Sequence, residues 1–250
     1  LGLGGGKSAT SSGAPGGGGG GFVNEYSVAF DGTDDFMDAG TSSDYSIVGG
    51  GSISYWIYPK TAAWTGYSES VGKRSTAGWQ VMHSPAGATM SILTYNHTFS
   101  NGYPVVTVTT ADQWYLITQV FHASGGATLY LNDGASGASG TGQTSAKPSY
   151  SYTEDATAPL YIARHPTLSN RYFTGNIDEV AVFSSELSAS DVEDIYNSGA
   201  PVDLSSYSPA SWWRMGDDDG ATGTTITNQG SGGNNGTLTN GPTFSTTVPS

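Results

Sequence analysis

Short stretches in which apolar and small polar residues alternate recur along this chain, separated by turns rich in Gly, Ser and Asn. Residues 26–30 alternate in this way, and so do residues 52–58, where Ile53, Tyr55 and Ile57 share one face. Alternation with a period of two is typical of strands that bury one face. The chain is therefore expected to be built mainly of β-strands.

Further strands are expected where the same pattern returns between turn signals. Gly125-Gly126 separates two of them, and Asn132-Asp133-Gly134 is a hairpin signal. Their spacing of roughly ten residues indicates an antiparallel sandwich or barrel. These strands are predicted over residues 114–121, 127–131, 159–163 and 175–183.

One short helix is predicted near residues 189–198. Ser188 is a suitable N-cap, Asp191 stands at the third position of a capping box, and Gly199 supplies a stop signal. No other segment shows a convincing helical period.

Composition restricts the function classes. The net charge is −13 with only 8 Lys and Arg, so a nucleic-acid partner is not expected. The chain has no Cys, which excludes disulfides and thiolate chemistry. It contains no apolar run of about 18 residues, so membrane insertion is not expected. The four His lack the spacing of a zinc site.

Residues 1–21 form a segment of their own that ends in six consecutive Gly, 16–21. Such a segment buries little and costs much backbone entropy to order. It is either a flexible linker or an arm that becomes ordered between subunits of an assembly. Residues 22–250 are expected to form one domain.

The strand pattern resembles a known family. The stretches 30–36, 52–59 and 114–134 are similar to strands of the concanavalin A-like (laminin-G-like) jelly rolls. The block Gly-x-Ile-Asp-Glu-Val at 175–180, followed by the capped helix, is the most specific match. The resemblance covers about residues 24–200 and implies an all-β, two-sheet antiparallel jelly-roll sandwich.

Residues 201–250 resemble the segment that usually precedes the first strand in this family. The stretches 212–216, 226–230 and 234–238 carry this likeness, although here they come last. The order implies a circular permutation, or a domain shared between tandem copies, that completes the main sandwich of 22–200. The arrangement is also similar to structural proteins of marine tailed bacteriophages.

Catalysis is not expected. The family includes glucanases, but a retaining glucanase needs two carboxylates close together on one face. Asp178 and Glu179 are adjacent, so an ordinary strand would point them to opposite faces. No Glu-x-Asp-x-x-Glu pattern occurs in the sequence.

Calcium is the ion that the resemblance implies. Carried over by position, Asp31 and Asp178 would be ligands of a structural Ca²⁺, together with the carbonyl of Gly32. The alternative is that Asp178 hydrogen-bonds backbone amides near the end of the sheet. The acidic run 217–219 is expected to be a solvated turn, because it lacks the Glu of an EF-hand.

Aromatic residues in loop-rich stretches are the candidates for carbohydrate binding, because sugar rings stack on exposed aromatic faces. Trp56, Trp79 and Trp114 lie inside strand patterns and are expected in the core, and Trp212-Trp213 is expected to have one buried face. The alternative use of the loop aromatics is packing against a neighbouring subunit. These candidates are Trp64, Tyr67, Tyr95, His97 and Tyr103.

The sequence thus predicts a non-enzymatic structural protein of a virion exterior, such as a capsid decoration, head fibre or tail-associated subunit. Its lectin-like domain would bind host-surface glycans, and residues 1–21 would bind other virion or surface-assembly subunits, including copies of the chain in a homo-oligomer. The alternatives are a carbohydrate-binding module of a secreted or surface bacterial protein and, less favoured, a glycan hydrolase.

Overall fold

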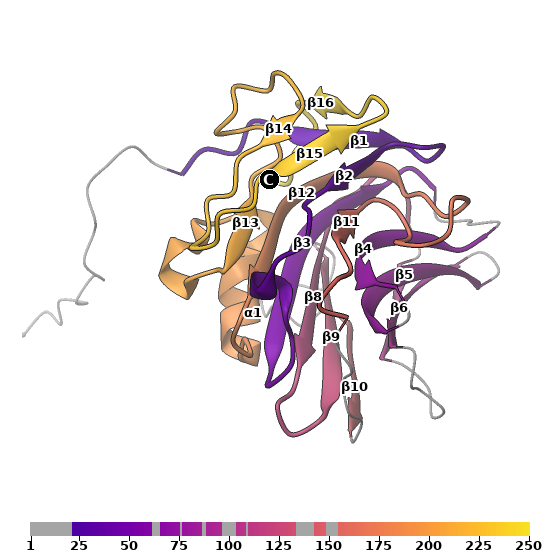
Figure 1. The fold of residues 1–250 in the computed structure, drawn as a ribbon, viewed down its shortest axis with the longest axis vertical. Helices are drawn as coiled ribbons and strands as arrows, with labels where there is room; N and C mark the ends of the chain where they lie inside the picture. The colour runs from indigo at the N-terminus through magenta and orange to yellow at the C-terminus, as the bar shows by residue number, and fades with distance from the viewer. Residues whose placement is uncertain are drawn as a thin grey trace, which may run out of the picture.

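The computed structural model describes two packed sheets (Figure 1). The structure describes residues 22–61, 66–75, 77–86, 89–96, 104–108, 110–133, 143–148 and 155–250. The predicted arm, residues 1–21, lies outside them.

Sheet A has its strands in the order β10-β9-β8-β3-β12-β1-β16, with β13 also paired to β12. All pairings in this sheet are antiparallel. Its strands are β1 (Ser27–Asp31), β3 (Gly51–Pro59), β8 (Tyr115–Phe121), β9 (Gly126–Asp133), β10 (Gln143–Pro148), β12 (Thr174–Phe183), β13 (Ser211–Trp213) and β16 (Thr243–Ser245).

Sheet B follows the order β14-β15-β2-β11-β4-β5-β6-β7, again antiparallel throughout. The sandwich predicted from alternation and resemblance is confirmed. The strands of sheet B are β2 (Phe36–Asp38), β4 (Ser68–Arg74), β5 (Gly78–Ala86), β6 (Thr89–Asn96), β7 (Val105–Val108), β11 (Leu160–Ile162), β14 (Thr225–Ile226) and β15 (Gly236–Thr239).

The main core lies between the two sheets. The face predicted for Ile53, Tyr55 and Ile57 is buried there, together with Trp79 and Trp213. Apolar side chains from both inner faces fill this layer, as expected of a sandwich. None of the helices in the described residues is long and apolar enough to span a membrane.

A second apolar cluster covers the outer face of sheet A, where α1 (Ala189–Tyr196) packs against Trp56 and Phe183. Trp56 is therefore buried under the helix and not between the sheets. The capping box at Ser188 and Asp191 is present with both hydrogen bonds. The helix ends at Asn197, whose φ of 43° is left-handed, before the predicted stop at Gly199.

The C-terminal strands join both sheets. β13 and β16 pair in sheet A, while β14 and β15 pair in sheet B. β14, β15 and β16 lie at the same end of the sandwich as β1 and β2 (Figure 1). The 3-10 turns are η1 (Ser43–Tyr45), η2 (Asn197–Gly199) and η3 (Leu204–Tyr207).

A β-bulge interrupts β12 between Asp178 and Ala181. Ile177 and Val180 both belong to the inner core, so the two residues between them share the outer face. Glu179 takes a left-handed φ of 48° there. The prediction that Asp178 and Glu179 point to opposite faces is therefore wrong, because the bulge adds a residue to the strand.

Candidate functional site

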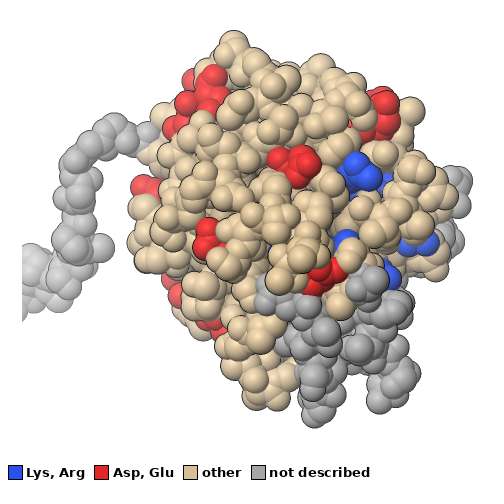
Figure 2. Space-filling view, viewed as in Figure 1, with Lys and Arg blue, Asp and Glu red and all other residues tan. Residues whose placement is uncertain are grey.

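The outer face of sheet B carries three of the six Lys and Arg side chains that the structure describes. Lys and Arg gather over β11, β4 and β5 in Figure 2, while acidic side chains are scattered elsewhere on the visible face. Arg164 and Arg171 come from the 163–173 hairpin that follows β11, and Arg74 ends β4. The face is thus positive on a chain whose net charge is −13.

The 163–173 hairpin packs across sheet B. Its two arms are joined by a bridge between Arg164 and Tyr172 and by a hydrogen bond from His165 N to Arg171 O at 2.9 Å. A Cβ added at Gly72 of β4 would lie 3.3 Å from the Pro166 side chain, so the hairpin approaches the strand closely. The hairpin therefore holds its arginines over the sheet.

Each of these two arginines is stacked on aromatic rings. The guanidinium carbon of Arg164 lies 4.4 Å from the centroid of Phe36 and 4.6 Å from that of Tyr161. The guanidinium carbon of Arg171 lies 4.7 Å from the centroid of Tyr67. Stacking fixes the planar group and leaves its edge for ligands.

Glu69 lies under Arg171 and is completely buried. Its Oε1 is 3.8 Å from Arg171 Nη1 and 3.8 Å from His165 Nε2, and neither carboxyl oxygen is hydrogen-bonded within the described part of the chain. Burial raises the pKa of Glu69 well above its usual range, against the opposing charges of Arg171 and Arg74. Glu69 therefore favours its neutral form.

His165 is held neutral beside it. Its Nδ1 accepts hydrogen bonds from the backbone N–H groups of Thr167 at 3.0 Å and Leu168 at 3.1 Å, so Nε2 carries the proton and faces Glu69. Burial, followed by the nearby arginines, lowers the pKa of His165 to about 4. The charge of this face at neutral pH thus comes from its arginines.

The structure places one of the predicted sugar-binding aromatics next to sheet B and another within it. Tyr67 immediately precedes β4 and is 45% exposed, beside Arg171. Tyr95 lies in β6 opposite Gln80 of β5, a residue of the same sheet. Trp64, His97 and Tyr103 lie outside the described residues. Arg164, Arg171 and Glu69 were missed, although two of only 8 basic residues stand between Tyr161 and Phe173.

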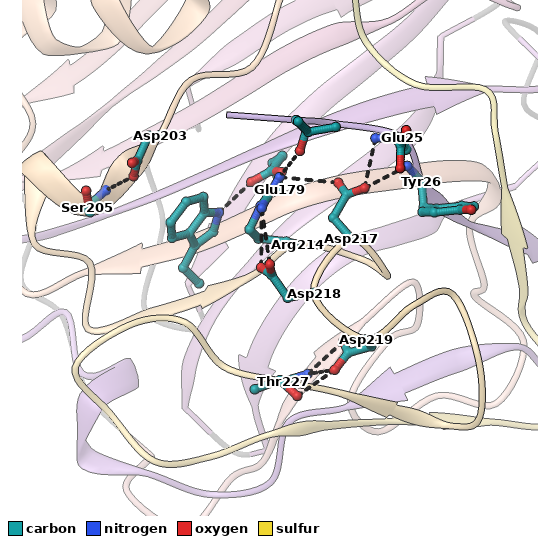
Figure 3. A network of polar contacts seen from close by, with 12 residues as sticks. Glu25, Tyr26, Glu179, Asp203, Ser205, Arg214, Asp217, Asp218, Asp219 and Thr227 are labelled. Carbon is teal, nitrogen blue, oxygen red and sulfur yellow. Dashed lines mark hydrogen bonds and ion pairs between the residues drawn. The ribbon is translucent and has the colours of Figure 1, made fainter. Parts of the chain in front are cut away.

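A cavity of about 740 Å³ opens at the outer face of sheet A, on the other side of the sandwich. Its centre is Arg214, which is bound by Glu179 Oε1 at 3.1 Å and by Asp217 and Asp218 (Figure 3). The remaining lining residues are Phe22, Val23, Glu25, Asp203, Ser205, Trp212 and Gln229.

This network fastens the segment 22–26 to the sheet. Asp217 Oδ1 accepts hydrogen bonds from the backbone N–H groups of Glu25 at 2.8 Å and Tyr26 at 3.0 Å, and Arg214 donates to the Val23 carbonyl (Figure 3). The Phe22 ring stacks on Trp212 at 6.3 Å. The predicted solvated turn at 217–219 is thus tied down at Asp217, whose side chain is 5% exposed.

The model of the Concanavalin A-like lectin/glucanases superfamily matches residues 31–193. The chain belongs to this superfamily. No curated protein matches it. The match runs from the last residue of β1 into α1 and stops before β13, so the segment with Trp212 and Trp213 lies beyond the family model.

Solved structures show the same fold. A Bacteroides ovatus protein provisionally described as carbohydrate-binding has a TM-score of 0.60 and 16% identity, and the alignment covers 91% of this chain and 62% of that one. The chain therefore spans less than two thirds of that protein. Weaker matches include domain 4 of a Geobacillus stearothermophilus arabinanase in complex with arabinotriose, at 17% identity, TM-score 0.44 and coverage of 68% and 75%.

The two acids in the bulge of β12 do not form an accessible pair for hydrolysis, as glucanases of the superfamily would require. Asp178 is fully buried and Glu179 is 3% exposed. Asp178 accepts from Asn24 Nδ2 at 3.1 Å, and Glu179 accepts from Trp212 Nε1 at 2.5 Å. Burial raises the pKa of both carboxyls, that of Glu179 to about 7. Both carboxyls are therefore shielded from solvent.

The structure does not bring Asp31 and Asp178 together. Asp31 pairs with Thr174, and Asp178 lies four residues farther along β12, which separates them by about 13 Å. Asp178 instead accepts the backbone N–H of Glu179 at 2.8 Å, as the alternative interpretation expected. These residues do not fit the calcium site that the superfamily resemblance implied.

Asp31 has other acidic neighbours. One carboxylate oxygen of Asp31, one of Asp34 and one of Asp35 lie within 4.8 Å of one another at the turn after β1. The backbone N–H of Thr33 lowers the pKa of Asp31, whereas burial raises that of Asp35. Gly32 stands in this turn with a φ of 79°.

Proposed function

We propose that the chain is a non-catalytic, lectin-like domain that binds glycans on the outer face of sheet B. The observation that carries this proposal is Tyr67, an aromatic ring 45% exposed and braced by Arg171. Exposed aromatic faces beside charged and amide groups suit sugar rings, which offer both C–H and hydroxyl surfaces. The buried acids of β12 support the absence of catalysis.

The setting that we propose is the exterior of a virion, with residues 1–21 as the anchor. Segment 22–26, to which they lead, is fixed on the outer face of sheet A through Arg214 and Asp217. The glycan face is the opposite side of the sandwich. An anchor on one side and a binding face on the other would direct the domain outward. The C-terminal strands, which resemble a permuted family segment, complete both sheets.

The test of glycan binding is an array probed with the purified chain and with two variants of one residue. Tyr67→Ala removes the ring, and Tyr67→Phe keeps it. We expect binding in the wild type and in Tyr67→Phe, and at least a tenfold loss in Tyr67→Ala, since stacking on one ring contributes about 1.5 kcal/mol. Val48→Ala, at another exposed apolar residue, is the control. Equal binding by Tyr67→Ala would reject this site.

The test of the anchor compares residues 1–250 with residues 22–250. We expect the longer chain to form a homo-oligomer in light scattering and the shorter chain to be a monomer that retains glycan binding. Monomers in both cases would remove the support for a virion subunit and favour a carbohydrate-binding module. Release of reducing sugar by either chain would contradict the non-catalytic assignment.

A further inference from the structure

We propose that the outer face of sheet B selects acidic glycans, and that Arg164 and Arg171 bind their carboxylate or sulfate groups. This inference rests on the proposed function and names the ligand class of the same face. It follows from a difference between arginines: among the described residues, these two guanidinium groups have no carboxylate at hydrogen-bond distance, whereas the guanidinium of Arg214 is surrounded by carboxylates.

Arg164 is positioned but lacks an acidic partner. Its Nε donates to the His165 carbonyl at 3.3 Å, and its guanidinium lies against Phe36, Tyr161 and Tyr172. Within the described residues its two terminal nitrogens donate to no oxygen. Burial, followed by the charge of Asp38, raises the pKa of the Tyr161 phenol. Asp38 Oδ1 accepts the backbone N–H of Gly40 at 2.8 Å.

Arg171 likewise lacks an acidic partner at hydrogen-bond distance in the described part of the chain. Its Nη1 lies 3.7 Å from Met82 Sδ, a weak acceptor, and 3.8 Å from Glu69 Oε1, which is beyond hydrogen-bond distance. Within the described residues, the guanidinium group of Arg171 donates no hydrogen bond to an oxygen atom. It is 26% exposed, so its free edge is accessible to a ligand.

Arg214 shows what a fully paired arginine looks like in this protein. It contacts the carboxylates of Glu179, Asp217 and Asp218 and donates to a backbone carbonyl. The chain has 21 Asp and Glu, so acidic partners are plentiful. Half-buried donors are normally satisfied. Two arginines of one hairpin that the described residues leave without a carboxylate at hydrogen-bond distance therefore indicate an external acceptor.

The chemistry of the acceptor follows from the guanidinium group. Its planar fork matches the two oxygens of a carboxylate and two of the three terminal oxygens of a sulfate ester. The aromatic rings beneath Arg164 and Arg171 hold the forks in place, and the exposed ring of Tyr67 offers stacking surface for the sugar rings that carry these groups. A neutral glycan would leave the forks unpaired.

The experiment measures binding of three polysaccharide classes by calorimetry at low and moderate salt. The probes are a neutral glucan, a polyuronate and a sulfated galactan, so that carboxylate and sulfate are distinguished. We expect binding of one or both acidic classes, weakening as salt increases, and at least tenfold weaker binding of the neutral glucan. The variants are Arg164→Gln and Arg171→Gln, each with an expected loss of about tenfold for the acidic ligand.

Lys60→Gln is the matched control, because it removes one positive charge that is paired with Asp112 away from this face. It should change affinity less than twofold. Arg171→Lys keeps the charge without the fork and should bind with intermediate affinity. If a glutamine variant fails to fold, Arg171→Lys and the salt dependence of wild-type binding still test whether the face selects acidic glycans.

The outcomes separate the two proposals. Binding of the neutral glucan as tightly as the acidic classes, insensitive to salt and to both arginine variants, would overturn the acidic selectivity and leave glycan binding in place. Binding of no polysaccharide and no array glycan would overturn both. Loss of acidic binding in Lys60→Gln equal to that in the arginine variants would show a general charge effect and reject the specific site.

Discussion

Asp178 and Glu179 are neighbours whose carboxyl groups lie on the same outer face of sheet A, because β12 carries a bulge between Asp178 and Ala181. Both are buried, and burial raises the pKa of each carboxyl; the charge of Glu179 raises that of Asp178 further. Arg214 opposes this effect at 3.1 Å from Glu179. The bulge thus concentrates titratable groups where segment 22–26 is fastened.

Glu179→Gln is expected to change the pH dependence of stability. Burial raises the pKa of Glu179 from 4.5 to about 7, so its favourable contribution is fully present below pH 4.5 and is lost as pH rises through 7. The difference between these pKa values corresponds to about 3 kcal/mol. Urea unfolding from pH 4.5 to 8 should show the variant gaining up to this amount relative to the wild type.

Glu186→Gln is the control for this measurement. The backbone N–H of Ala123 and the imidazole of His122 lower the pKa of Glu186, so its contribution is present above pH 4.5 and is lost as pH falls. The deficit of the variant relative to the wild type should therefore stay nearly constant above about pH 5 and shrink only as pH falls below 4.5, unlike the trend of Glu179→Gln. A parallel pH dependence of Glu179→Gln and the wild type would contradict the assignment.

Much of the fold could be predicted from alternation alone. β3, β8 and β12 have strongly apolar stretches, and the predicted turn at Gly125-Gly126 is present, with Gly125 N donating to the His122 carbonyl at 2.8 Å. β4 could not be predicted this way, because its sequence SESVGKR is polar and yet buried. The Ser70 side chain points into the core, where it hydrogen-bonds with Tyr55, while that of Glu69 points outward and is covered by the hairpin. The burial of β4 therefore depends on neighbouring elements and not on its own sequence.

The candidate site was predicted only in part. Exposed aromatics are visible in a sequence, and Tyr67 was found in this way. Arg164 and Arg171 could not be assigned, because an isolated arginine in a loop does not show whether a carboxylate pairs with it. That depends on the 163–173 hairpin folding over β4, a contact between segments about 90 residues apart. The bulge at Glu179 was missed for a similar reason, since a left-handed φ is rare for Glu.

Arg214→Met is expected to destabilise the protein by about 3–5 kcal/mol, because it leaves the carboxyl of Glu179 buried without its cation. It also removes the bond to the Val23 carbonyl. Amide exchange at Glu25 and Tyr26 should therefore accelerate more than exchange in β3. Lys60→Met, which breaks only an exposed pair, should cost about 0.5 kcal/mol or less. Equal effects of the two substitutions would refute the anchoring role.

Calcium binding stays a prediction, and Asp31, Asp34 and Asp35 are the residues in which to test it. Their like charges and the burial of Asp35 would be relieved by a cation. We expect millimolar Ca²⁺ to raise the melting temperature relative to chelator, and Asp34→Asn to abolish that increase. Mg²⁺ and Asp112→Asn serve as controls. The same melting temperature in Ca²⁺, Mg²⁺ and chelator would remove calcium from the description of this turn.

Gly175→Ala is expected to be among the most damaging single substitutions in sheet A. Gly175 is the second residue of β12 and has a φ of 141°, and an added Cβ would lie 2.2 Å from the carbonyl oxygen of Tyr58 in β3. Because both partners are backbone in the centre of the sheet, neither can move aside, and a loss of about 4 kcal/mol or more is expected. Gly233→Ala, where nothing lies within 4 Å, should stay within about 0.5 kcal/mol in the same denaturant titration. If Gly175→Ala unfolds at the same denaturant concentration as Gly233→Ala, the close pairing of β12 with β3 at this position is wrong, and with it the register that places Asp178 and Glu179 on the outer face.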